Sequence, residues 1–260
     1  MSEPLSCYLD FAIQTAYEAG RLTLGYFQTD LRTEFKSDDS PVTVADRRAE
    51  ELIRARIEFR FPTHAMLGEE YGDKVAEGAT HRWIIDPIDG TKAFMRGVPL
   101  YGVLLGLEIE GACAVGVAYF PALDEMLSAA SGLGCHWNGR PTRVSNTESL
   151  SRGIVSCTDN GSFRRHGVSR SWEAIQDASY HRVGWSDAYG HLLVATGRIE
   201  LMIEPSVKPW DCGPFPVILR EAGGYFGDWQ GSETIYSKRV LSTSRRLLPE
   251  VLGLVAAEGS

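Results

Sequence analysis

Helical spacing of apolar residues predicts two amphipathic helices near the start of the chain. The first covers about Tyr8 to Phe27 and the second covers Val44 to Arg60, with a polar, turn-like segment from Leu31 to Ser40 between them. Thr43 is suited to cap the second helix, because its hydroxyl can accept an amide hydrogen bond at a helix start. Pro62 follows closely and ends that helix.

Apolar runs typical of strands come next. Tyr101–Ile109 and Ala112–Phe120 are joined by Glu110-Gly111, which predicts a β-hairpin. We also expect strands at Trp83–Ile85 and at Asp124–Ala130, and loops and turns between positions 132 and 141, where glycine, asparagine and proline cluster.

Strands alternate with helices in the second half of the chain. We expect strands at Ile154–Cys157, Ile199–Ile203, Tyr225-Phe226 and Val240-Leu241, and helices at Arg170–Ala178, Ala188–Thr196, Asp211–Ala222 and Leu247–Ala257. This order favours a layered α/β half that follows an α+β half. The boundary is placed near Ser145 to Ser151, which divides the chain into subdomains of residues 1–147 and 148–260.

Composition narrows the classes of partner. The chain has 260 residues, of which 43% are hydrophobic, and a net charge of -8. It contains no run of five like charges, so we expect neither nucleic acid nor an anionic membrane as a partner. An anionic substrate would have to be attracted locally, for instance by a bound metal ion.

The cysteines and the N-terminus favour a cytoplasmic protein. Five scattered cysteines form no Cys-x-x-Cys pair, which argues against a zinc site or a disulfide framework. The first residues, Met1-Ser2-Glu3-Pro4, lack the basic start of a signal peptide, and no apolar run is long enough to span a membrane.

Two carboxylates stand where a short apolar strand ends, in Asp86-Pro87-Ile88-Asp89-Gly90-Thr91. A solvated Asp-Gly turn is the simple explanation, but three further acids lie at turns or element ends: Asp46, Glu69 and Asp211. Hard divalent ions such as Mg²⁺ prefer several carboxylate oxygens. The set as a whole therefore predicts a metal site, with the Ile88 carbonyl as a further ligand.

Each acid by itself also has a purely structural explanation. Glu69 fits an exposed turn, Asp46 fits a first-turn position that the helix dipole favours, and Asp211 fits a helix N-cap. The prediction therefore depends on the combination.

Gly68-Glu69-Glu70, the Asp86–Thr91 hexapeptide and Trp210-Asp211 together resemble the inositol monophosphatase family in order and spacing, over nearly the whole chain. The resemblance implies a layered αβαβα sandwich, hydrolysis of a small phosphate ester with two or three Mg²⁺ ions, and a homodimer. A metal pair of this kind can serve both the attacking and the leaving oxygen.

The resemblance also implies roles for individual residues. Those implied for the metal are Glu69, Asp86, Asp89, Asp211 and the Ile88 carbonyl. Thr91, paired with Asp46, would orient and activate the attacking water, and Glu69 counts with them as catalytic. Amides around Gly90 and Thr91 would hold phosphate oxygens, helped by a helix N-terminus, while Glu204 and Asp211 would contact the substrate.

The segment after the hexapeptide favours the histidinol-phosphate phosphatase branch of this family. Lys92-Ala93-Phe94 and Met95–Gly102 look like that branch, and Asp187 stands where inositol-type enzymes usually carry a small neutral residue. Histidinol phosphate carries an ammonium group, which Asp187 and Glu204 could bind through charge-assisted hydrogen bonds. Alternatively, Asp187 only caps the helix that follows it.

Three other functions remain open from the sequence. The first is an inositol or broad sugar phosphatase. The second is a phosphatase with a covalent aspartyl-phosphate, whose Asp-x-Asp-Gly-Thr motif differs because here the two aspartates are three positions apart. Since residues three apart on a strand face opposite sides, the Asp86 and Asp89 pair requires a turn. The third is a non-catalytic regulator on the same scaffold.

Overall fold

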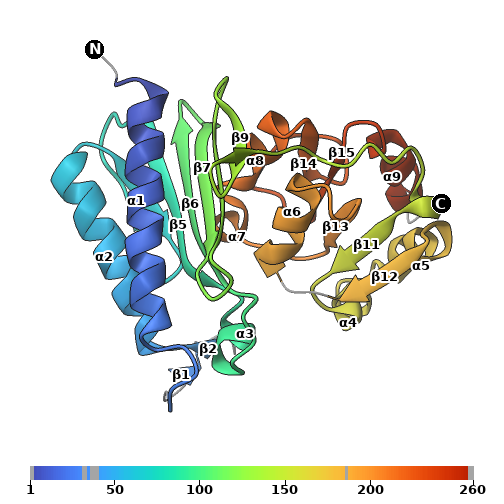
Figure 1. The fold of residues 1–260 in the computed structure, drawn as a ribbon, viewed down its shortest axis with the longest axis horizontal. Helices are drawn as coiled ribbons and strands as arrows, with labels where there is room; N and C mark the ends of the chain where they lie inside the picture. The colour runs from blue at the N-terminus through green and yellow to red at the C-terminus, as the bar shows by residue number, and fades with distance from the viewer. Residues whose placement is uncertain (1–2, 31–33, 36–40, 185–186, 257–260) are drawn as a thin grey trace.

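Helices and sheets alternate in five layers along the long axis of the molecule (Figure 1). The computed structural model describes residues 3–30, 34–35, 41–184 and 187–256. The layered αβαβα sandwich that the sequence resemblance implied is therefore confirmed.

The larger sheet has eight strands and is antiparallel apart from the β3–β5 pair. From edge to edge it contains β10 (Arg140–Pro141), β9 (Gly134–Trp137), β8 (Glu125–Ala130), β7 (Ala112–Phe120), β6 (Gly102–Ile109), β5 (His81–Asp89), β3 (Ala65–Gly68) and β4 (Gly72–Lys74).

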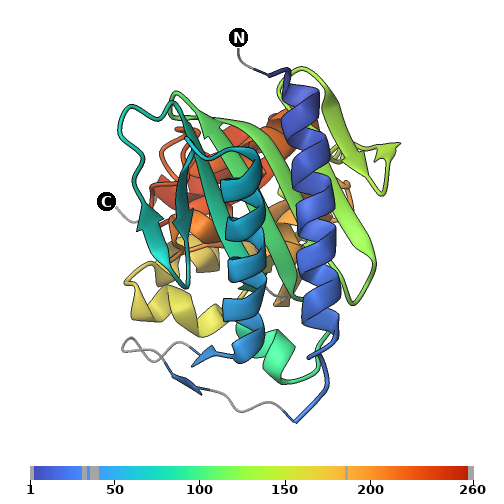
Figure 2. The same ribbon diagram turned by 90° about the vertical axis from the view of Figure 1, so that its left-hand side faces the viewer.

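Two long helices, α1 (Leu5–Leu24) and α2 (Val44–Arg60), cover the outer face of this sheet (Figure 2). Side chains alternate along β5 because successive residues of a strand point to opposite faces. Trp83 and Ile85 pack with α1 and α2, whereas Ile84 packs into the core on the inner side of the sheet. The position of Ile84 shows which face the following acids share.

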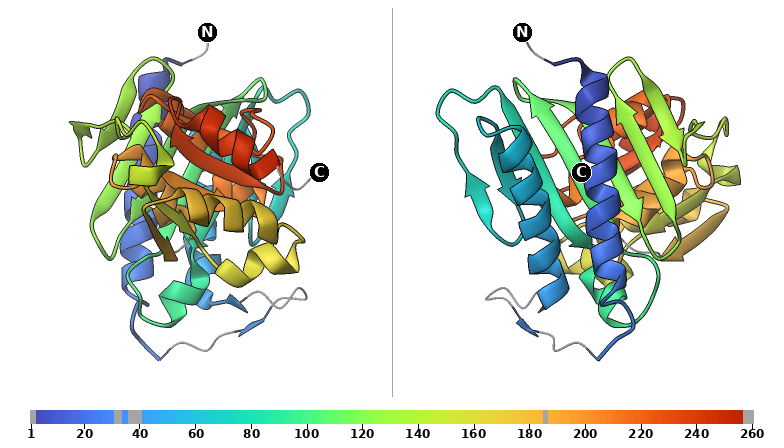
Figure 3. Two further views of the ribbon diagram at one scale, coloured as in Figure 1. Left: turned by 90° about the vertical axis from the view of Figure 1, so that its right-hand side faces the viewer. Right: turned by 60° about the vertical axis from the view of Figure 1, so that its left-hand side comes forward.

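The smaller sheet has five strands, in the order β12 (His181–Gly184), β11 (Ile154–Cys157), β13 (Leu201–Glu204), β15 (Val240–Ser244) and β14 (Gly224–Asp228). Between the sheets lie α6 (Asp187–Ala195), α7 (Pro209–Cys212) and α8 (Phe215–Glu221). The far face is covered by α4 (Asn160–Arg165), α5 (Ser169–Ala178) and α9 (Leu248–Val255), as the left view of Figure 3 shows.

Short elements complete the described chain: β1 (Glu34–Phe35), β2 (Pro41–Val42), α3 (Thr91–Met95) and the 3₁₀ turn Leu150–Arg152. None of the helices in the described ranges is both long and apolar enough to cross a membrane.

Predictions that depend on local sequence are confirmed. The second helix spans Val44–Arg60 as predicted, and the hydroxyl of Thr43 accepts a hydrogen bond from the Ala45 amide. The hairpin between β6 and β7 turns at Glu110 (φ 51°) and Gly111 (φ 80°). Two successive residues with positive φ match the twist of a tight hairpin.

Other predicted boundaries are wrong. The first helix begins at Leu5 and ends at Leu24 rather than at Phe27, and the predicted loop region 132–141 contains β9 and β10. The predicted helix Asp211–Ala222 is split into α7 and α8, since Pro214 has no amide hydrogen to continue the helix. Most of the predicted turn at Leu31–Ser40 lies outside the described residues.

Candidate active site

Asp86 and Asp89 lie within β5 and face the same side of the sheet. Asp86 pairs with Leu104 of β6 and Asp89 pairs with Gly102, so β5 advances three residues while β6 advances two. One extra residue in a strand is a β-bulge, and it returns the second aspartate to the face of the first. The sequence analysis expected a turn between them, which is wrong, because the strand continues through Asp89.

Asp211 completes a cluster with these two residues. It lies on α7, and its Oδ2 accepts a hydrogen bond of 2.8 Å from the Lys208 amide. Asp211 is therefore in the first turn of the helix. The structural alternative, that Asp211 is the N-cap, is wrong, because Lys208 holds that position. Carboxylate oxygens of Asp86, Asp89 and Asp211 lie within 4.8 Å of one another.

Small residues allow α7 to approach the sheet closely. A Cβ on Gly106 of β6 would lie 2.4 Å from the Gly213 carbonyl oxygen, and one on Gly116 of β7 would lie 2.3 Å from the Pro214 oxygen. The chain between α7 and α8 therefore rests directly on the backbone of two strands. This contact brings the end of α7 close to the sheet that carries Asp86 and Asp89.

Glu69 follows the end of β3, and its amide donates a hydrogen bond of 3.2 Å to the Ile85 carbonyl. Glu50 of α2, which is fully buried, holds the same turn. It accepts hydrogen bonds from the Glu70 amide (2.8 Å) and the Tyr71 amide (3.3 Å) and is paired with Arg54 at 2.7 Å. Glu50 was not singled out from the sequence, because the two amides that it binds lie 20 and 21 positions away.

Asp46 connects the start of α2 to the end of β5. Its Oδ2 accepts hydrogen bonds from the amide and the hydroxyl of Thr43, at 2.8 and 2.6 Å. Its Oδ1 lies 3.5 Å from Thr91 Oγ1, which also donates to the Ile88 carbonyl at 3.1 Å. Asp46 thus has the predicted structural role at the helix start and also contacts Thr91.

Burial and mutual repulsion raise the pKa values of the clustered acids. Burial is the main cause for Asp86 and Asp89, whose pKa values lie well above the usual range, and neighbouring carboxylates add to it. Burial likewise raises the pKa of Asp211 to about 7 and that of Asp46 to about 6. Acids held together in this way fit a divalent cation, which would compensate their charges.

Asp187 of α6 and Glu204 of the smaller sheet approach the cluster from its other side. Together with Asp89, Asp211 and Thr158 they line a small pocket of about 50 Å³. The Ala188 amide donates a hydrogen bond of 2.7 Å to Asp89 Oδ2, so the start of α6 is tied directly to the acid cluster. Burial raises the pKa of Asp187 to about 6 and that of Glu204 to about 8.

Among the residues of this pocket that the sequence analysis did not single out are Thr158 and His191. His191 is buried, and its Nδ1 lies 2.6 Å from Ser242 Oγ. Burial lowers the pKa of His191 to about 3. No local motif marks either residue, since each reaches the pocket through contacts with distant parts of the chain.

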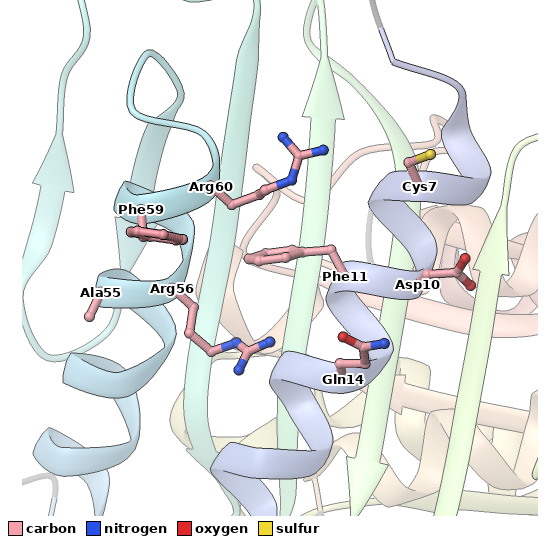
Figure 4. A pocket seen from close by; sticks show the side chains of 8 residues that line it. All are labelled: Cys7, Asp10, Phe11, Gln14, Ala55, Arg56, Phe59 and Arg60. Atoms are coloured by element: carbon pink, nitrogen blue, oxygen red, sulfur yellow. The ribbon is translucent and has the colours of Figure 1, made fainter.

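A second, wider hollow lies between α1 and α2, away from the acids (Figure 4). Its volume is about 670 Å³, and Phe11, Arg56 and Phe59 are among the residues that line it. Arg56 forms an ion pair with Glu18 of α1. None of the predicted site residues lines this hollow, so it contributes nothing to the acid cluster.

A family model and individual proteins that resemble this chain point to the same group of proteins. A family model described as the inositol monophosphatase family matches residues 4–259. The chain is 42% identical to a histidinol-phosphatase of Chlorobaculum parvum, over 97% of this chain and 96% of the relative. It is 34% identical to a histidinol-phosphatase of Mycobacterium tuberculosis, over 94% of this chain and 96% of that one.

Solved structures are similar over the same length. The crystal structure of the extragenic suppressor protein suhB from Bartonella henselae matches with a TM-score of 0.89 and 26% sequence identity, covering 96% of this chain and 98% of that chain.

Proposed function

The chain belongs to the inositol monophosphatase family of phosphatases, and on that premise we propose that it hydrolyses histidinol phosphate with the help of Mg²⁺. The products would be histidinol and inorganic phosphate. The observation that carries the choice of substrate is the acidic pair Asp187 and Glu204, which lines the pocket beside the metal-binding acids.

Asp86, Asp89 and Asp211 would hold the metal, together with Glu69 and the carbonyl of Ile88. We propose two or three Mg²⁺ ions, which when bound would neutralise phosphate charge, acidify a water molecule and stabilise the leaving alkoxide. The fit rests on the three aspartates, whose carboxylate oxygens lie close together and whose pKa values are raised.

Thr91 and Asp46 would position the attacking water. Thr91 Oγ1 can direct its proton to Asp46 Oδ1 or to the Ile88 carbonyl, which leaves its lone pairs to accept a hydrogen bond from water. Asp46 is itself held by hydrogen bonds from Thr43, so its carboxylate would fix the direction of the Thr91 hydroxyl before substrate binds. The amides of Gly90 and Thr91 would bind phosphate oxygens.

Asp187 and Glu204 would recognise the ammonium group of histidinol phosphate. Their pKa values are raised mainly by burial, which removes the stabilisation that water gives an exposed carboxylate, and for Asp187 the charge of Lys92 offsets only part of this effect. A bound cation would supply this stabilisation, whereas a neutral polyol such as inositol would not. Identity with two named histidinol-phosphatases supports the same substrate.

A comparison of substrates tests this proposal. The purified protein with Mg²⁺ should release phosphate faster from histidinol phosphate than from inositol 1-phosphate or glycerol 2-phosphate. Asp187→Asn should raise KM for histidinol phosphate about tenfold, which corresponds to one lost hydrogen bond between charged groups. Asp177→Asn, at an exposed position on α5, is the matched control. Equal rates for all three esters would refute the choice of substrate.

Inositol 1-phosphate is the second candidate substrate, because the family as a whole carries that name. The same set of esters decides between the two, since a preference for inositol 1-phosphate would establish this alternative. The family match supports hydrolysis by metal-activated water over an aspartyl-phosphate mechanism, and trapping of a phosphoenzyme would overturn that choice. A protein inactive on every ester would favour the non-catalytic regulator.

We also propose a cytoplasmic location and a homodimer. The division into a subdomain of residues 1–147, with most metal ligands, and one of residues 148–260, with Asp211 and the substrate contacts, stays a prediction.

A further inference from the structure

Thr158 lies between Glu204 of the smaller sheet and Asp187 of α6. It follows β11 directly, while Glu204 ends β13 and Asp187 begins α6. These three residues come from separate parts of the sequence, yet all of them line the small pocket beside Asp89 and Asp211.

The Thr158 hydroxyl is used in two directions at once. It donates its proton to Glu204 Oε1, and its oxygen accepts a hydrogen bond of 2.7 Å from the Asp187 amide. The Thr158 amide also donates to Glu204 Oε1, at 3.2 Å. A hydroxyl can do this because it has one proton to donate and two lone pairs to accept.

Both of these bonds to Glu204 anchor the same carboxylate oxygen. Oε1 receives one bond from the Thr158 hydroxyl and one from the Thr158 amide. Since Glu204 is buried, anchoring Oε1 also fixes the direction in which Oε2 points.

The backbone of Asp187 adopts a conformation that needs support. Its φ of 50° lies in the left-handed region, which residues other than glycine adopt rarely and aspartate tolerates better than most. The bond from its amide to Thr158 stabilises that conformation. The result is that an Asp187 carboxylate oxygen lies beside Gly90, 3.3 Å from where a Cβ on that glycine would be.

We propose that Thr158 is a positioning residue for substrate selectivity, which holds Glu204 and Asp187 in the one arrangement that suits an ammonium-bearing alcohol. It touches neither phosphate nor water in this scheme and acts only through the two acids. This inference rests on the proposed function, because it assumes that the two acids recognise a cationic substrate.

Two substitutions separate the hydroxyl from the shape of the side chain. Thr158→Val keeps the shape and removes the hydroxyl, whereas Thr158→Ser keeps the hydroxyl and removes a methyl group. Thr196→Val is the matched control, since that hydroxyl bonds to the Leu192 carbonyl in the same part of the chain and does not line the pocket. Each variant is assayed with Mg²⁺ on histidinol phosphate and on glycerol 2-phosphate, which has hydroxyls and no amine.

Thr158→Val should lower the preference for histidinol phosphate about tenfold, measured as the ratio of the two kcat/KM values, mainly through KM. The Thr158→Ser variant should keep at least half of the preference that the Thr158→Val variant loses. Thr196→Val should leave the ratio unchanged. An equal loss on both esters, or a Thr158→Ser variant that behaves like the valine variant, would overturn the proposal.

The same measurements keep the two proposals apart. The preference of the unchanged protein tests histidinol phosphate as substrate, and a ratio of one would refute that assignment. The change of the ratio on removing the hydroxyl tests Thr158, and an unchanged ratio in the valine variant would refute its positioning role.

Discussion

Replacing Asp89 by asparagine should stabilise the metal-free protein while it abolishes activity. Asp89 is buried and shares a cluster with Asp86 and Asp211, in which carboxylate oxygens lie within 4.8 Å of one another. Asparagine has nearly the same shape, and its oxygen can still accept the hydrogen bond that the Ala188 amide donates to Asp89. The substitution therefore removes charge with little change in packing.

The size of the effect follows from electrostatic repulsion. Two full charges 4.8 Å apart repel each other by about 3 kcal/mol where the effective dielectric constant is about 20. Partial protonation already relieves some of this, so we expect a gain of about 2 kcal/mol in the free energy of unfolding at pH 8. For a chain of this length, that corresponds to an increase in Tm of about 4–8 °C.

The effect should depend on pH in a defined direction. The pKa of Asp211 is raised from its ordinary value of 3.8 to about 7, and those of Asp86 and Asp89 are raised as well. The folded state therefore binds more protons than the unfolded state between about pH 4 and pH 7, and the stability of the metal-free protein falls as pH rises through that window. The gain from Asp89→Asn should be small at pH 5 and full at pH 8.

Urea unfolding in EDTA at pH 5, 6.5 and 8 measures these differences, with Asp177→Asn as the control on an exposed position. Adding Mg²⁺ should stabilise the unchanged protein more than the variant, because a ligand that binds only the folded state adds to its stability. A variant that is less stable than the unchanged protein in EDTA at pH 8 would refute the repulsion argument.

Three further substitutions test other parts of the site. Gly106→Ala places a Cβ 2.4 Å from the Gly213 oxygen, so the free energy of unfolding should fall by about 1–3 kcal/mol and the Mg²⁺ concentration for half-maximal activity should rise. The control is Gly253→Ala, whose Cβ meets nothing within 4 Å; it should neither lower the free energy of unfolding nor raise that Mg²⁺ concentration. Glu50→Gln should weaken the turn after β3 and raise the same Mg²⁺ concentration about fivefold, measured by titration of activity, since the turn amides lose the charge and one oxygen of their acceptor. An unchanged value would show that Glu50 does not position Glu69. Thr91→Val should lower kcat about 10²- to 10⁴-fold in steady-state assays with little change in KM, and an effect on KM alone would contradict its assigned role.

Local features of the fold were predictable from the sequence, and long-range ones were not. The second helix and its Thr43 cap depend on residues a few positions apart, and both agree with the structure. The bulge between Asp86 and Asp89 depends on the pairing of β5 with β6, which no local pattern encodes. The expected turn was therefore wrong, although the expectation that both aspartates belong to one site agrees with their proximity.

The candidate site shows the same division. Acidic motifs at element ends led to Asp86, Asp89 and Asp211, which the structure brings together. Thr158 could not be found in this way, because its partners Glu204 and Asp187 lie 46 and 29 positions away. A threonine has no special chemistry in isolation, and it becomes important only through the residues that it joins.

The layered fold separates the residues proposed for the reaction from those proposed for selectivity. Asp86, Asp89 and Thr91 belong to β5 and the segment after it, whereas Asp187 and Glu204 belong to α6 and the smaller sheet. Substitutions on the second group can therefore change the preferred alcohol while the first group stays intact. One bond limits this independence, because the Ala188 amide donates to Asp89 Oδ2. A change at Asp187 that shifts the start of α6 would move this donor, and it should then alter the Mg²⁺ requirement as well as KM.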